Sequence, residues 1–546
     1  MQTWLYNPLV LRARAYFHQH WRQALQLREK FALREEALHL ALAGVVGVLG
    51  GLVNLVFFYG IEYVKFFFLR RPGDPVEVAE MMPGWERVLI PAVGGLVAGG
   101  VLHWGLRIVG RQGPTNMLEV VVAGDGKLPL RSGLVNAASS LVSIGTGASI
   151  GREGGITQVT ATLASKLGQL AYWPPYRLRL LVGCGAASGI AAAYNAPIAG
   201  AVFAALIVLG NVSMNLFAPL VFSSVIAAMV SRSFFGIKPW YIVPPFEFTS
   251  VVQLPWFVLL GLGCGFMGAV FLKMIRQVKR RFEQVPQPIY VKMAFSGLVV
   301  GLIAIEFPGV WGNGYVVTNR ILQSEMPLLV LGGLFLAKLL ATVFTVSSGT
   351  VGGVFTPTLF LGASLGGFFG ATLHALGVAQ ELPTSSFALV GMGSALAATT
   401  RSPFLAMIMV FEISLDYSLM PPLMLGCVMA IVMAGRLEKD SIYTEPLRSK
   451  GLVDGEDTTR FGAATAQQVG DVMLAPVPPV RENAPLREIA NRFLTRANNF
   501  LPVVDAENRL LGARSGPMNL SSWPSKCAAT VGNVTMDAAQ VVPISA

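Results

Sequence analysis

The amino-acid sequence predicts an all-α polytopic membrane protein that ends in a small α/β cytoplasmic tail. Three observations lead to this prediction. Hydrophobic residues make up 53% of the 546 residues and charged residues only 13%, a balance far from that of a soluble domain. Long apolar stretches recur as far as residue 433, and from Gly435 onward the composition becomes that of a soluble protein.

The amino-terminal segment, residues 1–36, is polar and basic. It contains no apolar core typical of a cleavable signal peptide, so we expect the first span to remain in the mature protein. Basic residues gather in this segment and again between two later spans: Arg12, Arg14, Arg22, Arg28, Lys30 and Arg34, then Lys279, Arg280, Arg281 and Lys292. The positive-inside rule places both groups in the cytoplasm. The basic residues that give the net charge of +11 flank apolar spans and form no stripe, so no nucleic-acid partner is expected.

The membrane domain is predicted to cover residues 37–437. A helix needs about 20 residues to cross a hydrocarbon layer of about 30 Å. Several apolar stretches approach or exceed that length: 37–60, 88–109, 180–211, 214–230, 258–272, 328–346, 351–376 and 419–433. We therefore expect this domain to lie in the lipid bilayer. The cysteines show no metal-ligand spacing, so neither a metal site nor a disulfide framework is expected.

Two segments of the membrane domain resemble each other. Residues 185–203 align without gaps to residues 391–409, and the alignment places Pro197 on Pro403. This pattern predicts a duplicated domain with halves at about 37–236 and 253–437, whose site lies between the halves at the ends of broken helices. The alternative is chance recurrence of small residues in transmembrane helices, which explains the Ala and Gly matches better than the shared proline.

The most informative stretch contains an Arg-Glu pair between glycines, with apolar residues on both sides. Arg152 and Glu153 follow Gly151 and precede Gly154. An ionisable residue inside a membrane indicates a functional site, and a helix that begins here would direct its N–H groups toward an anion. Glu153 would compete with that anion for the same donors, which makes it a candidate gate. The alternative is an ion pair in a solvated loop.

A second glycine-rich helix start, Gly352-Gly353-Val354-Phe355-Thr356-Pro357, occupies a comparable place in the second half. Phe355 and Thr356 are expected to present backbone N–H groups to the same ion. Tyr443 lies just past the last apolar stretch, where its hydroxyl could donate to an anion from the cytoplasmic side. An interfacial aromatic anchor is the alternative for Tyr443, and spacing alone favours that alternative.

Taken together, these motifs resemble the CLC chloride channels and transporters over residues 37–450. The resemblance rests on Gly151-Arg152-Glu153-Gly154, the second glycine-rich helix start, residues 191–197 and Ser441-Ile442-Tyr443. It is closest to the bacterial ClcB-type subgroup in three segments: Gly113-Pro114-Thr115-Asn116, Val310-Trp311-Gly312-Asn313-Gly314-Tyr315 and Lys439-Asp440-Ser441-Ile442-Tyr443. The tail from residue 468 is similar to a CBS domain.

The resemblance implies an inverted-repeat helical fold and a homodimer with one pore per subunit. It further implies a bacterial inner-membrane protein whose termini both lie in the cytoplasm, with chloride or a similar small anion as its substrate. Glu153 is then the outer gating glutamate. The anion-binding residues implied by the resemblance, together with the substitute hydroxyl considered next, are Gly151, Arg152, Gly154, Val354, Phe355, Thr356, Tyr443 and Thr115.

The chain departs from the family pattern at two positions. Pro114 replaces the serine whose hydroxyl usually contacts the anion, and proline offers neither a hydroxyl nor an N–H. We expect Thr115 to supply the hydroxyl, and selectivity for chloride over nitrate stays open. Exchangers of the family generally carry an inner glutamate ten residues after the proline equivalent to Pro197, where this chain has Ile207. Glu412, in the second half, is expected to be structural.

The tail is predicted to consist of a linker, residues 438–467, and a partial CBS-like domain, residues 468–546. Residues 469–473 return in altered form as 531–535, and residues 500–504 alternate like a strand after a predicted helix at 486–494. The second copy ends too soon to close a nucleotide cleft, and residues 514–527 match the expected strand and helix poorly. Nucleotide binding by the tail is therefore not expected, and no cofactor is expected.

The leading functional hypothesis is a passive anion channel gated by Glu153, because Ile207 removes the obvious inner proton relay. A proton-coupled antiporter with another proton path, or a nitrate- or fluoride-preferring relative, is the nearest alternative. A membrane-embedded enzyme that uses Glu153 as acid or base lacks a second catalytic group. A sensor whose membrane part only anchors the tail does not explain the two glycine-rich helix starts.

Overall fold

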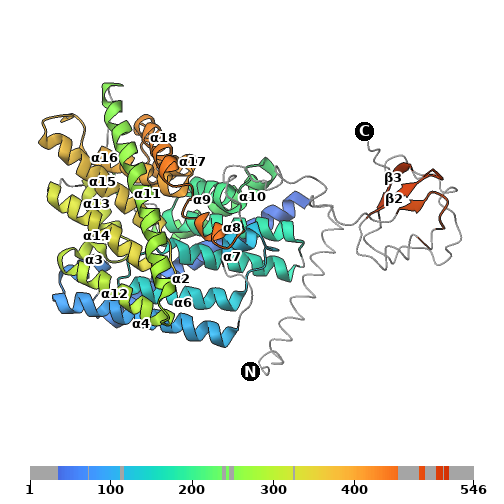
Figure 1. Ribbon diagram of the computed structural model, residues 1–546, viewed down its shortest axis with the longest axis horizontal. Helices are drawn as coiled ribbons and strands as arrows, with labels where there is room; N and C mark the ends of the chain where they lie inside the picture. Colours follow the sequence, from blue (N-terminus) through green and yellow to red (C-terminus); the bar gives the residue numbers. More distant parts are fainter. Residues whose placement is uncertain are drawn as a thin grey trace. The chain divides into compact units, whose positions relative to one another are not determined.

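The computed structural model describes residues 35–71, 73–110, 116–171, 173–236, 241–244, 251–323, 326–452, 479–485, 488, 500–507 and 509–515. The chain divides into two compact units, Met1–Phe461 and Gly462–Ala546. The first unit is a bundle of helices, and the second contains a small sheet (Figure 1). The predicted all-α membrane domain with a small α/β tail is confirmed.

The first half of the bundle runs from α2 to α10. Its helices are α2 (Glu35–Leu69), α3 (Pro75–Glu80), α4 (Gly84–Val109), α5 (Met117–Val122), α6 (Leu130–Gly145), α7 (Glu153–Leu170), α8 (Pro175–Tyr194), α9 (Pro197–Phe203), the π-helix η2 (Ala204–Leu209) and α10 (Met214–Phe235). Proline at the first turn of α8 and of α9 fits a helix start, because its missing N–H would have no partner there.

The second half runs from η3 to α18, and α19 follows it. Its helices are η3 (Val251–Gln253), α11 (Leu254–Gln284), α12 (Ile289–Glu306), η4 (Pro308–Val310), α13 (Tyr315–Gln323), α14 (Leu328–Ser347), α15 (Phe355–Ala375), α16 (Thr384–Thr400), α17 (Pro403–Ser414), α18 (Met420–Leu437) and α19 (Glu445–Arg448).

The two halves repeat the same helix order and packing. Helix α7 packs on α8 as α15 packs on α16, and α2 packs on α10 as α11 packs on α18. Backbone details repeat as well, because α8 and α16 both end at a left-handed residue, Asn195 (φ 59°) and Arg401 (φ 60°). Gly147 and Gly349, each four residues before the bridging glycine of its loop, have φ values of 94° and 93°. The duplication therefore extends from sequence to backbone conformation.

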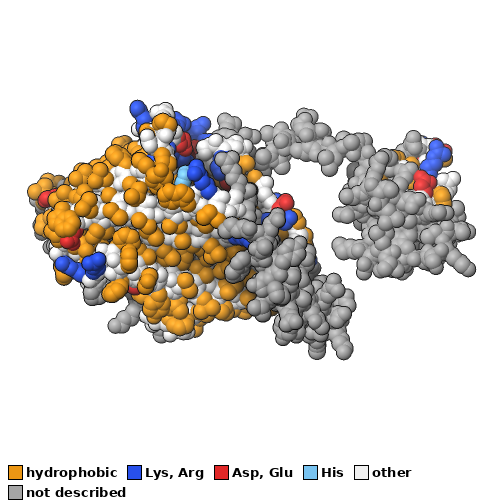
Figure 2. All heavy atoms as spheres, turned by 90° about the horizontal axis from the view of Figure 1, so that it is seen from below, with side chains coloured by type: hydrophobic (Ala, Val, Ile, Leu, Met, Phe, Trp, Pro, Cys, Tyr) orange, Lys and Arg blue, Asp and Glu red, His pale blue; other side chains and the backbone are white. Residues whose placement is uncertain are grey.

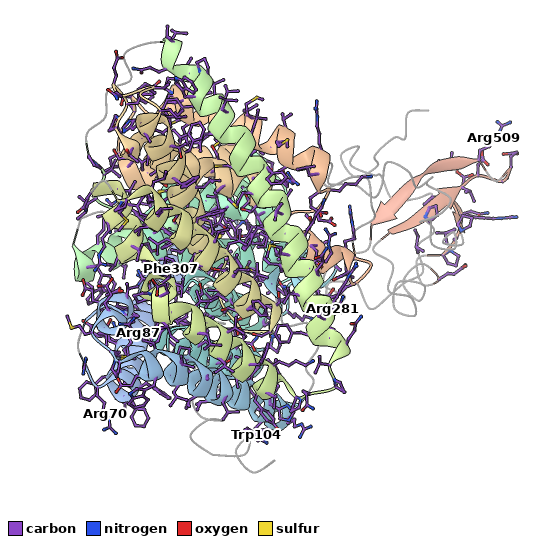
Figure 3. The ribbon with its side chains drawn as sticks, turned by 60° about the vertical axis from the view of Figure 1, so that its left-hand side comes forward. Arg70, Arg87, Trp104, Arg281, Phe307 and Arg509 are labelled. Carbon is purple, nitrogen blue, oxygen red and sulfur yellow. The ribbon has the colours of Figure 1, made fainter. Side chains whose placement is uncertain are left out.

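The repeats run in opposite directions through the bundle. The equivalent helices α4 and α12 pack antiparallel, since Arg87 at the start of α4 donates to the Ile305 carbonyl at the end of α12 (2.9 Å). At the other end of α4, Trp104 stacks on Tyr290 with 5.4 Å between ring centroids. Figure 3 shows Arg87 and Trp104 at opposite ends of α4, with Arg281 of α11 at the Trp104 end. This is the arrangement of an inverted repeat.

Within the described residues, eight helices are long and apolar enough to cross a membrane. Six of them coincide with predicted apolar stretches and α11 extends another, whereas α12 includes Lys292, which we expected to lie before a span. The predicted stretch 180–211 is not one span: it breaks at Asn195 into α8 and the short helix α9. Hydrophobic side chains cover much of the visible face of the first unit, with charged side chains at its margins (Figure 2).

Close backbone approach holds the centre of the bundle together. Helix α8 is buried from Leu180 to its end, and α16 is almost entirely buried. A Cβ added at Gly362 of α15 would collide with the backbone of Gly391 in α16, and one at Gly391 would collide with Gly362. These glycines let α15 and α16 cross at close range, as small residues do in membrane helix pairs.

In the second unit, three strands form a sheet in the order β1-β2-β3. Strand β1 (Val480–Arg481) pairs parallel with β2 (Phe500–Val504), and β2 pairs antiparallel with β3 (Leu510–Ser515). The predicted strand at 500–504 is confirmed, and β3 reaches into the segment 514–527. Apart from Glu488, the predicted helix at 486–494 lies outside the described residues, as does the second motif copy at 531–535.

Candidate anion site and gate

The two glycine-rich loops meet in the structure. Gly151 and Gly353 form an isolated antiparallel β-bridge, in which the Gly151 amide donates to the Gly353 carbonyl (2.7 Å) and the Gly353 amide donates to the Gly151 carbonyl (2.8 Å). Helix α7 begins two residues after Gly151, and α15 begins two residues after Gly353. The bridge therefore brings together the starts of two helices that lie about 200 residues apart in the chain.

Glycine is required in these loops because a side chain would collide with the site. A Cβ at Gly151 or at Gly353 would overlap the Glu153 carboxylate, and one at Gly154 would overlap the backbone of Gly352 and Gly353. In the structure, the group that approaches the loops closely is the Glu153 carboxylate.

Glu153 is the first residue of α7, and only 2% of it is exposed. Its Oε1 accepts the Thr356 amide N–H (3.1 Å), and its Oε2 accepts the Thr356 hydroxyl (3.0 Å). The carboxylate thus occupies the N-terminal end of α15, where unpaired N–H groups and the helix dipole favour a negative charge. Charge-assisted hydrogen bonds of this kind are among the stronger ones in proteins.

Arg152 is the N-cap residue of α7 and is also buried. Its guanidinium donates to the Ala193 carbonyl (3.4 Å) and lies 5.7 Å from the centroid of the Tyr315 ring. Its positive charge attracts the Glu153 carboxylate. The structure therefore places Arg152 beside Tyr315 and the end of α8, and from there its positive charge acts electrostatically on the Glu153 carboxylate.

Val354 and Phe355 form the start of α15. Val354 is the N-cap residue, and the buried Phe355 ring lies 5.4 Å from the ring of Tyr194. The Tyr194 hydroxyl lies 2.6 Å from the Thr356 hydroxyl. The side chain of Thr356 therefore connects Glu153 to Tyr194.

Tyr443 reaches the same region from the segment after α18. Its ring lies 5.8 Å from the ring of Phe203 at the end of α9, and its phenol is near enough to Glu153 for the two to interact electrostatically. The amide of the preceding residue, Ile442, donates to the Thr399 carbonyl of α16 (3.0 Å). Tyr443 thus packs on the end of α9, and 290 residues separate it from Glu153 in the chain.

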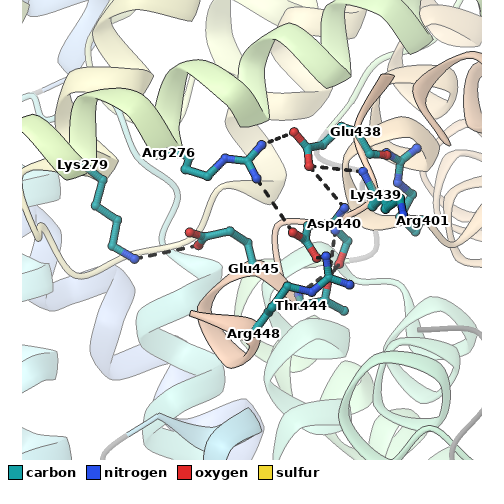
Figure 4. Close-up of polar contacts among 10 residues, drawn as sticks. Arg276, Lys279, Arg401, Glu438, Lys439, Asp440, Thr444, Glu445 and Arg448 are labelled. Atoms are coloured by element: carbon teal, nitrogen blue, oxygen red, sulfur yellow. Dashed lines mark hydrogen bonds and ion pairs between the residues drawn. The ribbon is translucent and has the colours of Figure 1, made fainter. Parts of the chain in front are cut away.

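A network of ion pairs holds the segment that carries Tyr443 (Figure 4). Arg276 of α11 pairs with both Glu438 and Asp440. Asp440 also pairs with Arg448 (2.9 Å). A separate ion pair joins Lys279 to Glu445 (3.8 Å). Residues 438–452, which we assigned to the linker, are folded against the helical bundle here.

Thr115 and Pro114 lie outside the described residues. The next residue, Asn116, is the N-cap of α5, and its side chain accepts the Leu118 amide (3.0 Å). Ile207 lies in η2 among apolar side chains. Glu412 of α17 accepts the amides of Ile198 (2.9 Å) and Ala199 (2.6 Å) at the start of α9, which links the two halves.

Sequence reasoning assigned no role to three buried residues around the site: Tyr194, Tyr315 and Lys338. Lys338 of α14 donates to the carbonyls of Val310 (3.0 Å) and Gly312 (2.9 Å), and thereby holds the loop that leads into Tyr315. A lone lysine in the apolar stretch 328–346 was the signal that could have revealed it. The contacts of Tyr194 and Tyr315 depend on the tertiary fold, and their positions in the sequence give no sign of them.

Comparison with known proteins shows where the chain belongs. A family profile described as voltage gated chloride channel matches residues 94–435, and a CBS domain profile matches residues 469–513. A putative chloride channel protein, ClcB-like, from Ralstonia nicotianae is 39% identical over 431 residues, which are 78% of this chain and 100% of that protein. The voltage-gated ClC-type chloride channel ClcB of Citrobacter koseri is 34% identical, covering 74% of this chain and 98% of that one.

Solved structures share the fold. A slow cyanobacterial Cl-/H+ antiporter has a TM-score of 0.67 at 24% identity and covers 77% of this chain and 98% of its own. A CLC-type fluoride/proton antiporter has a TM-score of 0.60 at 22% identity and covers 74% of this chain and 97% of its own. The chain is a multi-pass membrane protein that belongs to the voltage gated chloride channel family, the CLC family, and carries a CBS domain in its tail.

Proposed function

We propose that this protein conducts chloride or a similar small anion passively, and that Glu153 is its gate. The observation that carries the proposal is the position of the Glu153 carboxylate on the N-terminal end of α15. That position offers hydrogen-bond donors and a positive dipole end to one negative group. A carboxylate that occupies it excludes a chloride ion from the same donors.

Opening follows when Glu153 is protonated or displaced. A neutral carboxyl group loses its charge-assisted bonds to Thr356, so it competes poorly with an anion for the start of α15. The anion would then take the donors released by Glu153, in the positive field of Arg152. Gly151, Gly154, Val354 and Phe355 supply the backbone around it, and Tyr443 bounds the site on the side of α9. External acid should therefore increase conduction.

Passive conduction is favoured over proton exchange because the inner relay position holds Ile207, an aliphatic residue that cannot carry a proton. Glu412, a partly buried carboxylate of the second half, is engaged in capping α9. Solved proteins with this fold are described as antiporters, so coupled exchange is the second candidate function. A chloride gradient that drove sustained uphill proton movement in liposomes would establish exchange and exclude the passive channel.

The direct experiment measures anion efflux from liposomes that contain the purified protein, with Glu153→Gln as the test variant. Glutamine keeps the size of the side chain but carries no charge and does not titrate. We expect Glu153→Gln to conduct at neutral pH as the native protein does in acid. Efflux of chloride, nitrate and fluoride, measured one at a time, would test selectivity, with Pro114→Ser as the variant that restores the usual family residue.

We further propose that the protein is a homodimer in a bacterial inner membrane, with both termini in the cytoplasm. Large apolar side chains of α10, α17 and α18 are exposed in the single subunit, among them Phe222, Val225, Phe404, Met424 and Val428. A second copy would cover these faces while each subunit keeps its own pore. The mass of the protein in detergent should correspond to two chains, and Phe404→Lys should shift that mass toward one chain.

A further inference from the structure

Tyr194 is the last residue of α8 and is almost completely buried. Its hydroxyl lies 2.6 Å from Thr356 Oγ1, and Thr356 Oγ1 lies 3.0 Å from Glu153 Oε2. Two hydroxyl groups therefore connect the end of α8 to the gating carboxylate. These two hydrogen bonds join three helices: α8, α15 and α7.

The charge of Glu153 fixes the direction of these hydrogen bonds. An ionised carboxylate only accepts, so the single Thr356 hydroxyl proton must point to Glu153. The Thr356 oxygen then accepts, and the proton between the two hydroxyls must come from Tyr194. When Glu153 is protonated it can donate instead, and both hydroxyls are free to reverse. Donation from Tyr194 to Thr356 and from Thr356 to Glu153 is thus specific to the ionised gate.

The backbone around Tyr194 is anchored from two other helices. The Ala192 carbonyl accepts from Asn54 of α2 (2.9 Å) and Ser231 of α10 (3.1 Å). The next residue after Tyr194 is the left-handed Asn195, whose side chain accepts from Arg232 of α10 (2.5 Å). The hydroxyl is therefore held in place before the gate closes, which reduces the entropy lost when the hydrogen bonds form.

We propose that Tyr194 is a positioning residue for the gate: by donating to Thr356 it orients the Thr356 hydroxyl toward ionised Glu153 and stabilises the closed pore. This inference rests on the proposed gating function of Glu153. The charged and titratable groups that interact with Glu153 or with this tyrosine, among the described residues, are Arg152, Tyr194, Tyr241, Tyr315 and Tyr443. Two of these tyrosines, Tyr194 and Tyr315, hydrogen-bond to the Thr356 side chain, and the Tyr194 hydroxyl lies 2.6 Å from Thr356 Oγ1.

The test compares Tyr194→Phe with Tyr241→Phe as a matched control. Tyr241 is equally buried, lies 5.1 Å from Tyr315 by ring centroids, and has a hydroxyl with no hydrogen-bond partner among the described residues. Chloride efflux from liposomes is measured against external pH. Removing one hydroxyl that favours the ionised gate should move the midpoint of activation to higher pH by about half to one unit. Tyr241→Phe should leave the midpoint where it is in the native protein.

A double-mutant cycle separates positioning from a general packing effect. Because Tyr194 acts through Thr356, Tyr194→Phe should cause no further shift in a Thr356→Val background. An equal shift in both backgrounds, or equal shifts from Tyr194→Phe and Tyr241→Phe, would overturn the inference. If Glu153→Gln leaves the pH dependence intact, the gating function itself fails. If Glu153→Gln removes it while Tyr194→Phe causes no shift, only the role of Tyr194 fails.

Discussion

The starts of α7 and α15 are equivalent in the duplicated fold and differ in the side chains that they present. Both follow a left-handed glycine and a bridged glycine, Gly147 and Gly151 in one half, Gly349 and Gly353 in the other. The first half then contributes a charge at Glu153, whereas the second contributes donors at Thr356. Duplication thus supplies a symmetric backbone, and the difference in side chains places a carboxylate on one side and its hydrogen-bond donors on the other.

This comparison also distinguishes which features are shared scaffold and which are specific to one half. The glycines belong to the scaffold, because side chains at Gly154 or Gly353 would collide across the bridge, and one at Gly151 would overlap the Glu153 carboxylate of its own loop. Glu153 and Thr356 are the specific pair. The largest expected effect therefore comes from disturbing the scaffold, and smaller effects come from disturbing the pair or its distant supports.

Gly154→Ala should destabilise the protein more than any other change considered below. Its new Cβ would overlap the backbone of Gly352 and Gly353, which cannot move aside without breaking the bridge between the halves. The expected cost is about 1–3 kcal/mol or more, measured as a lower thermal unfolding temperature in detergent. Gly263→Ala is the matched control, since a Cβ there meets no atom within 4 Å. An equal change in unfolding temperature for both variants would contradict the scaffold role.

Thr356→Val tests the specific pair without touching the scaffold. Valine keeps the shape and the backbone N–H but removes the hydroxyl that donates to Glu153. Because that bond favours the ionised form, its loss should make Glu153 easier to protonate, and the pore should open about half to one pH unit higher. The measurement is chloride efflux against external pH.

The control for this change is Thr358→Val, two residues further along α15. The Thr358 hydroxyl donates to the Val354 carbonyl within the helix (2.8 Å) and has no bond to Glu153. It should leave the midpoint unchanged. A shift as large as that of Thr356→Val would mean that the start of α15 responds to any loss of a hydroxyl, and that the pair is not specific.

Arg276→Gln should have the smallest effect, because it acts on the segment that carries Tyr443 and not on the helix starts. It removes the ion pairs to Glu438 and Asp440. The Arg276 side chain is partly exposed, so solvent screening limits the loss to about 1 kcal/mol. We expect a slightly lower unfolding temperature whose difference from the native protein shrinks in high salt.

Lys127→Gln is the control for the ion-pair network, since its pair with Asp125 is 3.9 Å long and both side chains are largely exposed. It should leave the unfolding temperature unchanged. If Arg276→Gln and Lys127→Gln behave alike, the network around residues 438–448 contributes no more than an ordinary surface ion pair.

Sequence reasoning recovered the helical membrane fold because apolar length and the repeat around Pro197 and Pro403 are local signals. It did not recover the break at Asn195. Asn195 and Pro197 are a helix stop and a helix start that could have revealed it. Apolar length alone counted residues 180–211 as one span. Lys292 concealed the start of α12 for a related reason, since one charge near a helix end does not prevent a span.

At the site, the glycine-rich helix starts were visible in the sequence because their residue types are unusual between apolar stretches. Which groups they bind was not visible. That Glu153 accepts from Thr356, and that Tyr194 supports Thr356, depends on contacts between residues 162 to 203 positions apart. Such contacts follow from how the halves fold together, and no spacing rule encodes them.

The pH dependence of chloride efflux from liposomes containing the native protein or Glu153→Gln tests the central claim most directly. The native protein should conduct slowly near neutral pH and at least about tenfold faster in external acid, since protonation removes the charge that holds Glu153 on α15. Glu153→Gln should conduct at the higher rate throughout. A glutamine variant that kept the native pH dependence would contradict the assignment of Glu153 as the gate.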